Sequence, residues 1–242
     1  MPRAVLTRDD VAAYAAALAS LGLDAVAMPV TRTAPPPDPG ALAKALADEY
    51  DAIVVASRRA ADAIAAAGTP HGEVWAVGPA TLRALADAGI GATYPSEARD
   101  GESLARAIVA SAAGRGVIGQ TQPMAGKRVL LPRSEGGRAE AAEVLRAAGA
   151  DVVEVIAYRT IAAGPVDVDV LRECAVCVVF APSQVAALAP IVRLADLLAR
   201  FVAIGETTAS ALRAVGVRPA VAEAPTPEGI ARAVASVYPP RL

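Results

Sequence analysis

The sequence repeats itself along nearly its whole length. Segments of the first half return in the same order in the second half, at a nearly constant displacement. The matching pairs are RAVLTR (3–8) with RVLLPR (128–133), LASLGLDAVAMPVTRT (18–33) with LRAAGADVVEVIAYRT (145–160), AIVVASRRAADAI (52–64) with VCVVFAPSQVAAL (176–188), AVGPATLRALADAGI (76–90) with AIGETTASALRAVGV (203–217), and ESLARAIVAS (102–111) with EGIARAVASV (228–237). Such a chain is expected to build a similar structural unit twice.

Within each repeat, short apolar runs alternate with amphipathic helical patterns. The predicted strands of the first half are 4–6, 25–30, 52–56 and 74–77, and the predicted helices are 11–21, 42–47, 81–88 and 103–111. Hydrophobic residues make up 55% of the chain but aromatic residues only 3%, so Ala-rich helices can pack closely on Val-rich strands. We therefore predict an α/β fold with two doubly wound parallel sheets, and interpret 113–126 as the loop between the halves.

Both halves are interrupted after their second strand. TRTAPPPDP (31–39) is Pro-rich and reads as an extended linker, and YRTIAAGPVD (158–167) occupies the matching place in the second half. We expect the chain to cross between two domains at these two points.

Charge and hydropathy limit the partners of the chain. The formal net charge is −2 and no long basic run occurs, so nucleic acid is not an expected ligand. No apolar stretch is long enough to span a bilayer, and the first residues lack a signal-peptide pattern. We expect a cytoplasmic protein with no membrane partner.

Several common catalytic sets are absent from the sequence. The single histidine, His71 in GTPHGE, excludes a Ser-His-Asp triad elsewhere and any His-rich metal site, and we interpret it as a solvated turn residue. No Walker A loop occurs, and SEGGRAE (134–140) is interpreted as a turn into a helix. Cys174 and Cys177 stand at the entry to a strand, where a separation of three predicts opposite faces. Without a second pair for zinc, we interpret them as buried structural residues.

Five hydroxyl side chains follow predicted strands, at the start of the next helix. They are Ser57, Thr81, Ser183, Thr207 and Thr208. Ligands of open α/β sheets bind at this edge, where free N–H groups favour carboxylates and phosphates. The alternative is helix capping by Ser and Thr, and the sequence leaves both interpretations open.

Three arginines and one tyrosine extend this set. Arg8 and Arg133 end the first strand of each half, and Arg138 lies near a predicted helix start. A guanidinium there can bind a carboxylate with two hydrogen bonds, or it can form a surface ion pair. Tyr158 ends the strand at the second linker, where it can act as a weak general acid or pack against the linker.

The collinear set of segments resembles the uroporphyrinogen-III synthase family. The resemblance rests on VLTR near the N-terminus, VVEVIAYRT, VVFAPSQVAAL, and above all FVAIGETTASALRAVGV followed by EAPTPEGIARAV. It implies two α/β domains joined by a two-stranded linker, with a cleft between them. Domain 1 is expected to comprise 1–32 and 162–242, domain 2 to comprise 37–157, and the linkers to be 31–39 and 158–167.

The resemblance also implies an activity. Members cyclise hydroxymethylbilane to uroporphyrinogen III with inversion of ring D and loss of water, on the way to haem, sirohaem or corrinoids, and use no metal or organic cofactor. Tyr158 matches the tyrosine proposed to assist departure of the hydroxyl group. The residues Ser57, Thr81, Ser183, Thr207 and Thr208 match substrate-binding positions, and Arg8, Arg133 and Arg138 are further candidates. Ala181 stands where relatives often have serine.

Two further expectations concern assembly. We expect a monomer that receives its substrate by a transient hand-off from hydroxymethylbilane synthase. The alternative function is a non-catalytic module that binds a tetrapyrrole or small anion on the same fold.

Overall fold

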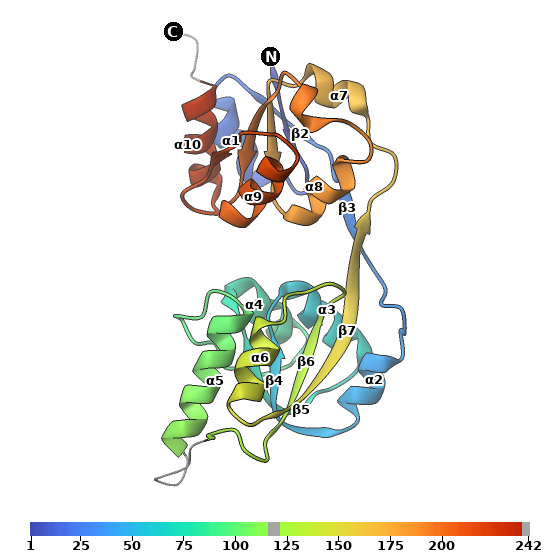
Figure 1. Ribbon diagram of the computed structural model, residues 1–242, viewed down its shortest axis with the longest axis vertical. Coiled ribbons are helices and arrows are strands. Elements are labelled where there is room, and N and C mark those ends of the chain that lie inside the picture. The colour runs from blue at the N-terminus through green and yellow to red at the C-terminus, as the bar shows by residue number, and fades with distance from the viewer. Residues whose placement is uncertain (116–121, 239–242) are drawn as a thin grey trace. The chain divides into compact units, whose positions relative to one another are not determined.

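The chain folds into two compact units, each built around its own five-stranded sheet. The computed structural model describes residues 1–115 and 122–238. Unit 1 comprises Met1–Arg32 and Thr160–Leu242, and unit 2 comprises Thr33–Arg159. Both sheets are largely parallel and carry helices on both faces (Figure 1), which confirms the predicted α/β class.

Unit 1 has the strand order β10-β9-β8-β1-β2, with every neighbouring pair parallel. Its strands are β1 (Arg3–Leu6), β2 (Asp24–Ala27), β8 (Val176–Val179), β9 (Arg200–Ala203) and β10 (Ala220–Val221). Its helices are α1 (Ala12–Ala19), α7 (Val168–Glu173), α8 (Pro182–Leu188), α9 (Glu206–Ala214) and α10 (Pro227–Val237), with a 3-10 turn at Leu194–Asp196. Alternate strand residues face two cores. Val5 packs with α7, α8 and α9, whereas Leu6 packs with α1 and α10.

Unit 2 has the order β3-β7-β6-β4-β5. Its strands are β3 (Thr31–Ala34), β4 (Glu49–Val55), β5 (His71–Ala76), β6 (Arg128–Ser134) and β7 (Asp151–Ala162). Its helices are α2 (Ala41–Leu46), α3 (Arg58–Ala67), α4 (Gly78–Asp87), α5 (Gly101–Arg115) and α6 (Glu140–Ala147). The α5 and α6 helices cover one face of the sheet, and α2, α3 and α4 cover the other (Figure 1). The neighbouring strands β3 and β7 carry the chain across the division between the units.

Each sheet has one point where the chain reverses the direction in which it adds strands. In unit 1 the chain goes from β1 outward to β2, and later from β8 through β9 to β10 on the other side. In unit 2 it goes from β4 to β5 and then from β6 to β7. The two connections part at the carboxyl ends of the central strands and leave a crevice where open α/β sheets bind ligands. These switch points are β1/β8 in unit 1 and β4/β6 in unit 2.

Some local expectations were wrong. The α4 helix begins directly after β5, with Pro79 in its first turn, so Thr81 lies inside the helix and not at its start. The α5 helix continues to Arg115, so 113–115 are helical and not part of a loop; 116–121 of the expected loop lie outside the described residues.

The two cysteines are free and buried, as predicted, but they do not lie on opposite faces. Cys174 ends α7 instead of lying in a strand, and its side chain therefore enters the same core as Cys177 in β8. Burial raises the pKa of the Cys174 thiol to about 11 and that of the Cys177 thiol well above its usual value.

In the described part of the chain, no helix is long and apolar enough to cross a membrane. Across residues 1–115 and 122–238, no group of three or more His, Cys, Asp or Glu side chains is placed to hold a metal ion.

Candidate functional site

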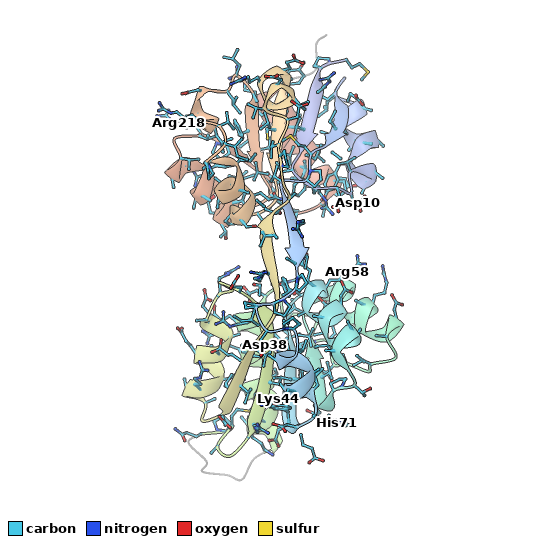
Figure 2. All side chains as sticks on the ribbon, turned by 90° about the vertical axis from the view of Figure 1, so that its right-hand side faces the viewer. Asp10, Asp38, Lys44, Arg58, His71 and Arg218 are labelled. Atoms are coloured by element: carbon cyan, nitrogen blue, oxygen red, sulfur yellow. The ribbon has the colours of Figure 1, made fainter. Side chains whose placement is uncertain are left out.

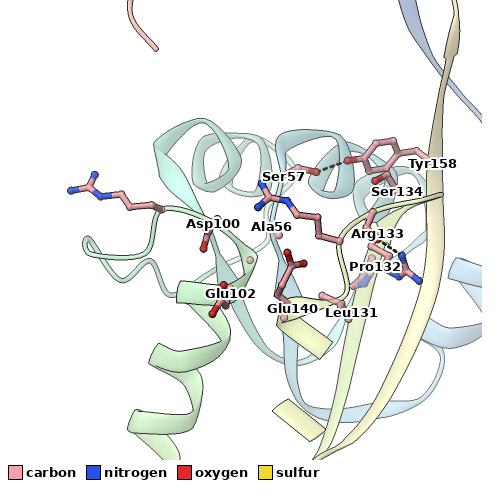
Figure 3. Close-up of a pocket in the computed structure, with 15 residues that line it drawn as sticks. Ala56, Ser57, Asp100, Glu102, Leu131, Pro132, Arg133, Ser134, Glu140 and Tyr158 are labelled. Carbon is pink, nitrogen blue, oxygen red and sulfur yellow. Dashed lines mark hydrogen bonds between the residues drawn. The ribbon is translucent and has the colours of Figure 1, made fainter. Parts of the chain in front are cut away.

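A pocket opens at the switch point of unit 2, between the carboxyl ends of β4 and β6. Its volume is about 290 Å³. It is lined by Ala56, Ser57, Arg99, Asp100, Gly101, Glu102, Leu131, Pro132, Arg133, Ser134, Gly137, Arg138, Glu140, Ala141 and Tyr158 (Figure 3). Four predicted site residues, namely Ser57, Arg133, Arg138 and Tyr158, therefore meet in one pocket although they are far apart in the sequence.

Ser57 both begins α3 and contacts Tyr158. Its Oγ accepts a hydrogen bond from the backbone N–H of Ala60 at 3.1 Å, which makes it the N-cap of the helix. The same Oγ lies 3.0 Å from the hydroxyl oxygen of Tyr158, which β7 brings to the edge of the pocket (Figure 3). Since the cap uses only an acceptor site, the hydroxyl proton of Ser57 is free for the tyrosine oxygen. Capping and site chemistry, the two alternatives left open by the sequence, are thus combined in one side chain.

Two of the three arginines that line this pocket, Arg133 and Arg138, differ in their partners. Arg133 Nε lies 2.6 Å from Glu154 Oε2, and Arg133 Nη1 donates to the Gly137 carbonyl at 2.8 Å. Both charged side chains are less than one third exposed, so Arg133 is paired inside the unit with a carboxylate that also pairs with Arg146 at 2.8 Å. Arg138 is exposed just before α6, and it forms no ion pair within the described residues. Of the two, Arg138 is the one whose charge is available to a ligand.

Three acidic residues that line the pocket were missed from the sequence. They are Asp100 and Glu102 at the start of α5 and Glu140 at the start of α6, two residues after Arg138 (Figure 3). Asp100 and Ser103 exchange hydrogen bonds at the start of α5, and the backbone N–H and hydroxyl of Ser103 lower the pKa of Asp100. The sequence signal was Asp-x-x-Ser before an apolar run, which is a helix-start pattern. Because Asp100 and Glu102 are both acidic, an anionic ligand is expected to bind away from the start of α5 and nearer Ser57, Tyr158 and Arg138.

His71 does not belong to this pocket. It is exposed at the first residue of β5, at the opposite edge of the unit from Arg58, which follows Ser57 (Figure 2). The sequence interpretation as a solvated residue is confirmed, although it lies at a strand start and not in a turn.

At the switch point of unit 1, a buried hydrogen-bond network joins β1 to β8. Gln184 Oε1 accepts from the Thr7 hydroxyl at 2.6 Å and from the backbone N–H groups of Phe180 and Ala181 at 2.7 and 3.1 Å. Gln184 Nε2 donates to the Thr7 carbonyl at 2.7 Å. Gln184 thus accepts hydrogen bonds from backbone N–H groups at the start of α8, where the N-cap residue Ala181 has no side-chain acceptor of its own. Sequence reasoning found neither Thr7 nor Gln184, since the bond joins residues from opposite ends of the chain.

The remaining hydroxyl candidates fall into two groups. Ser183 and Thr207 are exposed in the first turns of α8 and α9. Thr81 and Thr208 are only 4% and 3% exposed, because each lies on the buried stripe of its helix, four residues before a buried leucine. That four-residue spacing was visible in the sequence. Ser183 and Thr207 are therefore accessible to a ligand, whereas Thr81 and Thr208 are buried in the cores of their units.

Together these features define a class of protein: an α/β protein with two largely parallel sheets and a polar small-molecule pocket at a switch point. The pocket holds hydroxyl groups and arginines, of which Arg138 forms no ion pair within the described residues. Such a site can bind carboxylates and assist proton transfer.

Comparison with known proteins agrees with this class of protein and identifies the family within it. The family model described as "Uroporphyrinogen-III synthase HemD" matches residues 12–232. The chain belongs to the uroporphyrinogen-III synthase family.

Individual relatives agree with this family. A curated uroporphyrinogen-III synthase from Synechococcus elongatus is 31% identical over 158 residues, a match that spans 61% of this chain and 55% of that protein. Two solved structures share the fold. The uroporphyrinogen-III synthetase of Helicobacter pylori 26695 has a TM-score of 0.66 at 15% identity, covering 98% of this chain and all of that one. A mutant uroporphyrinogen III synthase of Thermus thermophilus has a TM-score of 0.61 at 19% identity, covering 98% of this chain and 97% of that one.

Proposed function

We propose that the chain is a uroporphyrinogen-III synthase, a hydro-lyase that cyclises hydroxymethylbilane to uroporphyrinogen III with inversion of ring D and loss of water. The observation that supports this most strongly is the family match over residues 12–232. The substrate is a flexible chain of four pyrroles bearing many carboxylates. Its recognition needs anion-binding groups rather than a metal, and the reaction transfers protons and releases water with no redox step.

The Ser57–Tyr158 pair supports the acid step. When Ser57 donates its proton to the Tyr158 oxygen, the phenol proton is free to point at a leaving hydroxyl group. Once the phenol has given up its proton, the same serine hydrogen bond stabilises the phenolate. We therefore assign Tyr158 as the general acid and Ser57 as the group that orients it.

Carboxylate binding is assigned to the accessible residues at the strand ends of both units. In unit 2 this is Arg138, and in unit 1 these are Arg8, Ser183 and Thr207. The buried hydroxyls of Thr81 and Thr208 and the paired guanidinium of Arg133 are proposed to shape the walls. Each charge-assisted hydrogen bond to a carboxylate is worth about 1.5–3 kcal/mol, so a few suffice for a protein with a net charge of −2.

Such a site must favour the inverted product isomer over the uninverted one. Hydroxymethylbilane also closes without an enzyme, to the uninverted isomer. Each tenfold preference for the inverted product requires about 1.4 kcal/mol of differential stabilisation between two transition states. Holding the end rings so that the free carbon of one meets the substituted carbon of the other would supply this preference by positioning.

The cellular setting follows from the proposed reaction. We propose a monomer in the cytoplasm that receives the labile substrate directly from hydroxymethylbilane synthase and supplies haem, sirohaem or corrinoid synthesis.

Product isomer analysis tests the proposal. Fresh hydroxymethylbilane is incubated with the protein, quenched within minutes and oxidised, and uroporphyrins I and III are separated by chromatography. Dominant type III product is expected. Type I alone, at the rate of the protein-free control, would overturn the enzyme assignment, and bound tetrapyrrole under those conditions would favour the non-catalytic binding module.

A further inference from the structure

Arg8 occupies the switch point of unit 1, between groups from three elements. It lies just past the end of β1, while Phe180 follows the neighbouring strand β8 directly and Tyr14 projects from α1. This is the edge at which open α/β sheets bind ligands.

Two aromatic rings hold the guanidinium of Arg8. Its central carbon lies 5.4 Å from the ring centre of Tyr14 and 5.1 Å from that of Phe180. The two rings contact each other edge to face, with centres 5.4 Å apart and planes at 71°. Arg8 Nη1 also donates a hydrogen bond to the Tyr14 hydroxyl at 3.1 Å. Since Tyr14 is only 6% exposed, its ring is a fixed support, and the orientation of the guanidinium is set by contacts on more than one side.

These supports do not neutralise the charge. Within residues 1–115 and 122–238, Arg8 forms no ion pair, although Asp9 and Asp10 follow it directly, and the Asp9 carboxylate accepts from the backbone N–H of Asp10 instead. Arg8 Nε is buried and has no hydrogen-bond partner in that part of the chain. Arg133, the counterpart of Arg8 in the sequence repeat, is paired with Glu154. At matching positions of the repeat, Arg133 thus contacts a carboxylate, whereas Arg8 contacts two aromatic rings and no carboxylate within the described residues.

We infer that Arg8 is a preoriented carboxylate-binding group and that Tyr14 and Phe180 are the positioning residues that fix its plane. The inference rests on the proposed function for the identity of the ligand, a carboxylate side chain of the linear tetrapyrrole or of its cyclic product. A planar guanidinium with several N–H donors can bind both oxygens of a carboxylate from one fixed direction. A lysine ammonium has neither the plane nor the stacking contact, so it does not replace Arg8.

The test compares variants by steady-state kinetics with hydroxymethylbilane and by equilibrium binding of uroporphyrin III. Arg8→Gln and Arg8→Lys are both expected to raise KM and the Kd for uroporphyrin III by about tenfold or more. Tyr14→Phe keeps the ring and removes only the hydroxyl. It is expected to raise KM about two- to fivefold with kcat unchanged. The matched control is Arg218→Gln, an exposed arginine before β10 in the same unit, which should behave as wild type.

Thermal unfolding of each variant separates binding from folding. If Tyr14→Phe lowered kcat and the unfolding midpoint but left KM unchanged, its role would be structural only and the positioning role would be refuted. Wild-type KM and Kd in Arg8→Lys would refute the planar carboxylate contact. If wild type gave only type I product while Arg8→Gln and Arg8→Lys still weakened uroporphyrin III binding, the proposed function would fail and the Arg8 site would stand.

Discussion

Replacing Ser57 by alanine removes two hydrogen bonds that the structure places on one oxygen atom. The first caps α3 through the N–H of Ala60 at 3.1 Å, and losing an N-cap of this type costs about 1 kcal/mol. The second joins Ser57 to the Tyr158 hydroxyl at 3.0 Å in a half-buried setting, which adds about 0.5–1 kcal/mol. We expect Ser57→Ala to lower the unfolding free energy of unit 2 by about 1–2 kcal/mol, or roughly 4–8 °C in its midpoint.

Two comparison variants separate the contributions. Tyr158→Phe removes only the second bond, so it should cost about 0.5–1 kcal/mol in stability but lower kcat by about a hundredfold or more, as expected for loss of a general acid. The counterpart of Ser57 in the repeat is Ala181, the N-cap of α8, and Ser183 is an exposed serine in the first turn of that helix. Ser183→Ala should therefore change stability by less than about 0.5 kcal/mol.

Differential scanning calorimetry with the isomer assay measures both effects. Wild-type melting of Ser57→Ala, or an equal loss in Ser183→Ala, would refute the capping argument. A kcat of Tyr158→Phe within about threefold of wild type would refute the acid assignment.

Three further predictions concern the buried polar groups and the thiols. Gln184→Leu leaves the backbone N–H groups of Phe180 and Ala181 without their acceptor, whereas the Thr7 hydroxyl can still donate to the Val178 carbonyl at 3.1 Å. Denaturant unfolding of unit 1 should therefore show a loss of about 2–4 kcal/mol, and a loss below about 1 kcal/mol would contradict the network. Glu154→Gln removes the carboxylate that Arg133 and Arg146 share and should destabilise unit 2 by about 1–2 kcal/mol in the same assay, whereas a stabilised variant would contradict the pairing. Burial raises the pKa of both thiols, so native protein at pH 8 should react slowly with a thiol reagent while unfolded protein reacts fully. Unfolded thiols ionise near about pH 8.5, whereas the folded Cys174 thiol has a pKa of about 11, so the unfolding free energy should fall as the pH rises through that interval. The fall should be smaller in Cys174→Ala. Rapid labelling of the native protein would disprove the burial of both thiols.

The sequence repeat predicted the two parallel sheets because each repeat supplies its own alternation of strand and helix. The sequence also named Ser57 and Tyr158 as site candidates, and their roles remain predictions. Ser57 follows β4 as expected, but Tyr158 lies inside β7 and does not end that strand, because β7 continues to Ala162. The sequence did not predict that they touch, because β7 reaches the carboxyl end of β4 only through the order of strands in the sheet.

The errors have local causes. Thr81 was expected at a helix start, but the helix begins directly after the strand and turns that threonine into the core. The partners of Arg8 and Arg133 were outside the reach of sequence reasoning for a different reason. Phe180 and Glu154 are selected by sheet register and neighbouring strands and not by distance along the chain.

The fraction of type III uroporphyrin, measured at fixed hydroxymethylbilane and increasing protein concentration, tests the central claim most directly. The account predicts that this fraction rises toward one with wild-type protein, and that Tyr158→Phe needs about a hundredfold more protein to reach the same value. A type III fraction that stays at the protein-free level at every concentration would contradict the assignment of this chain as a synthase.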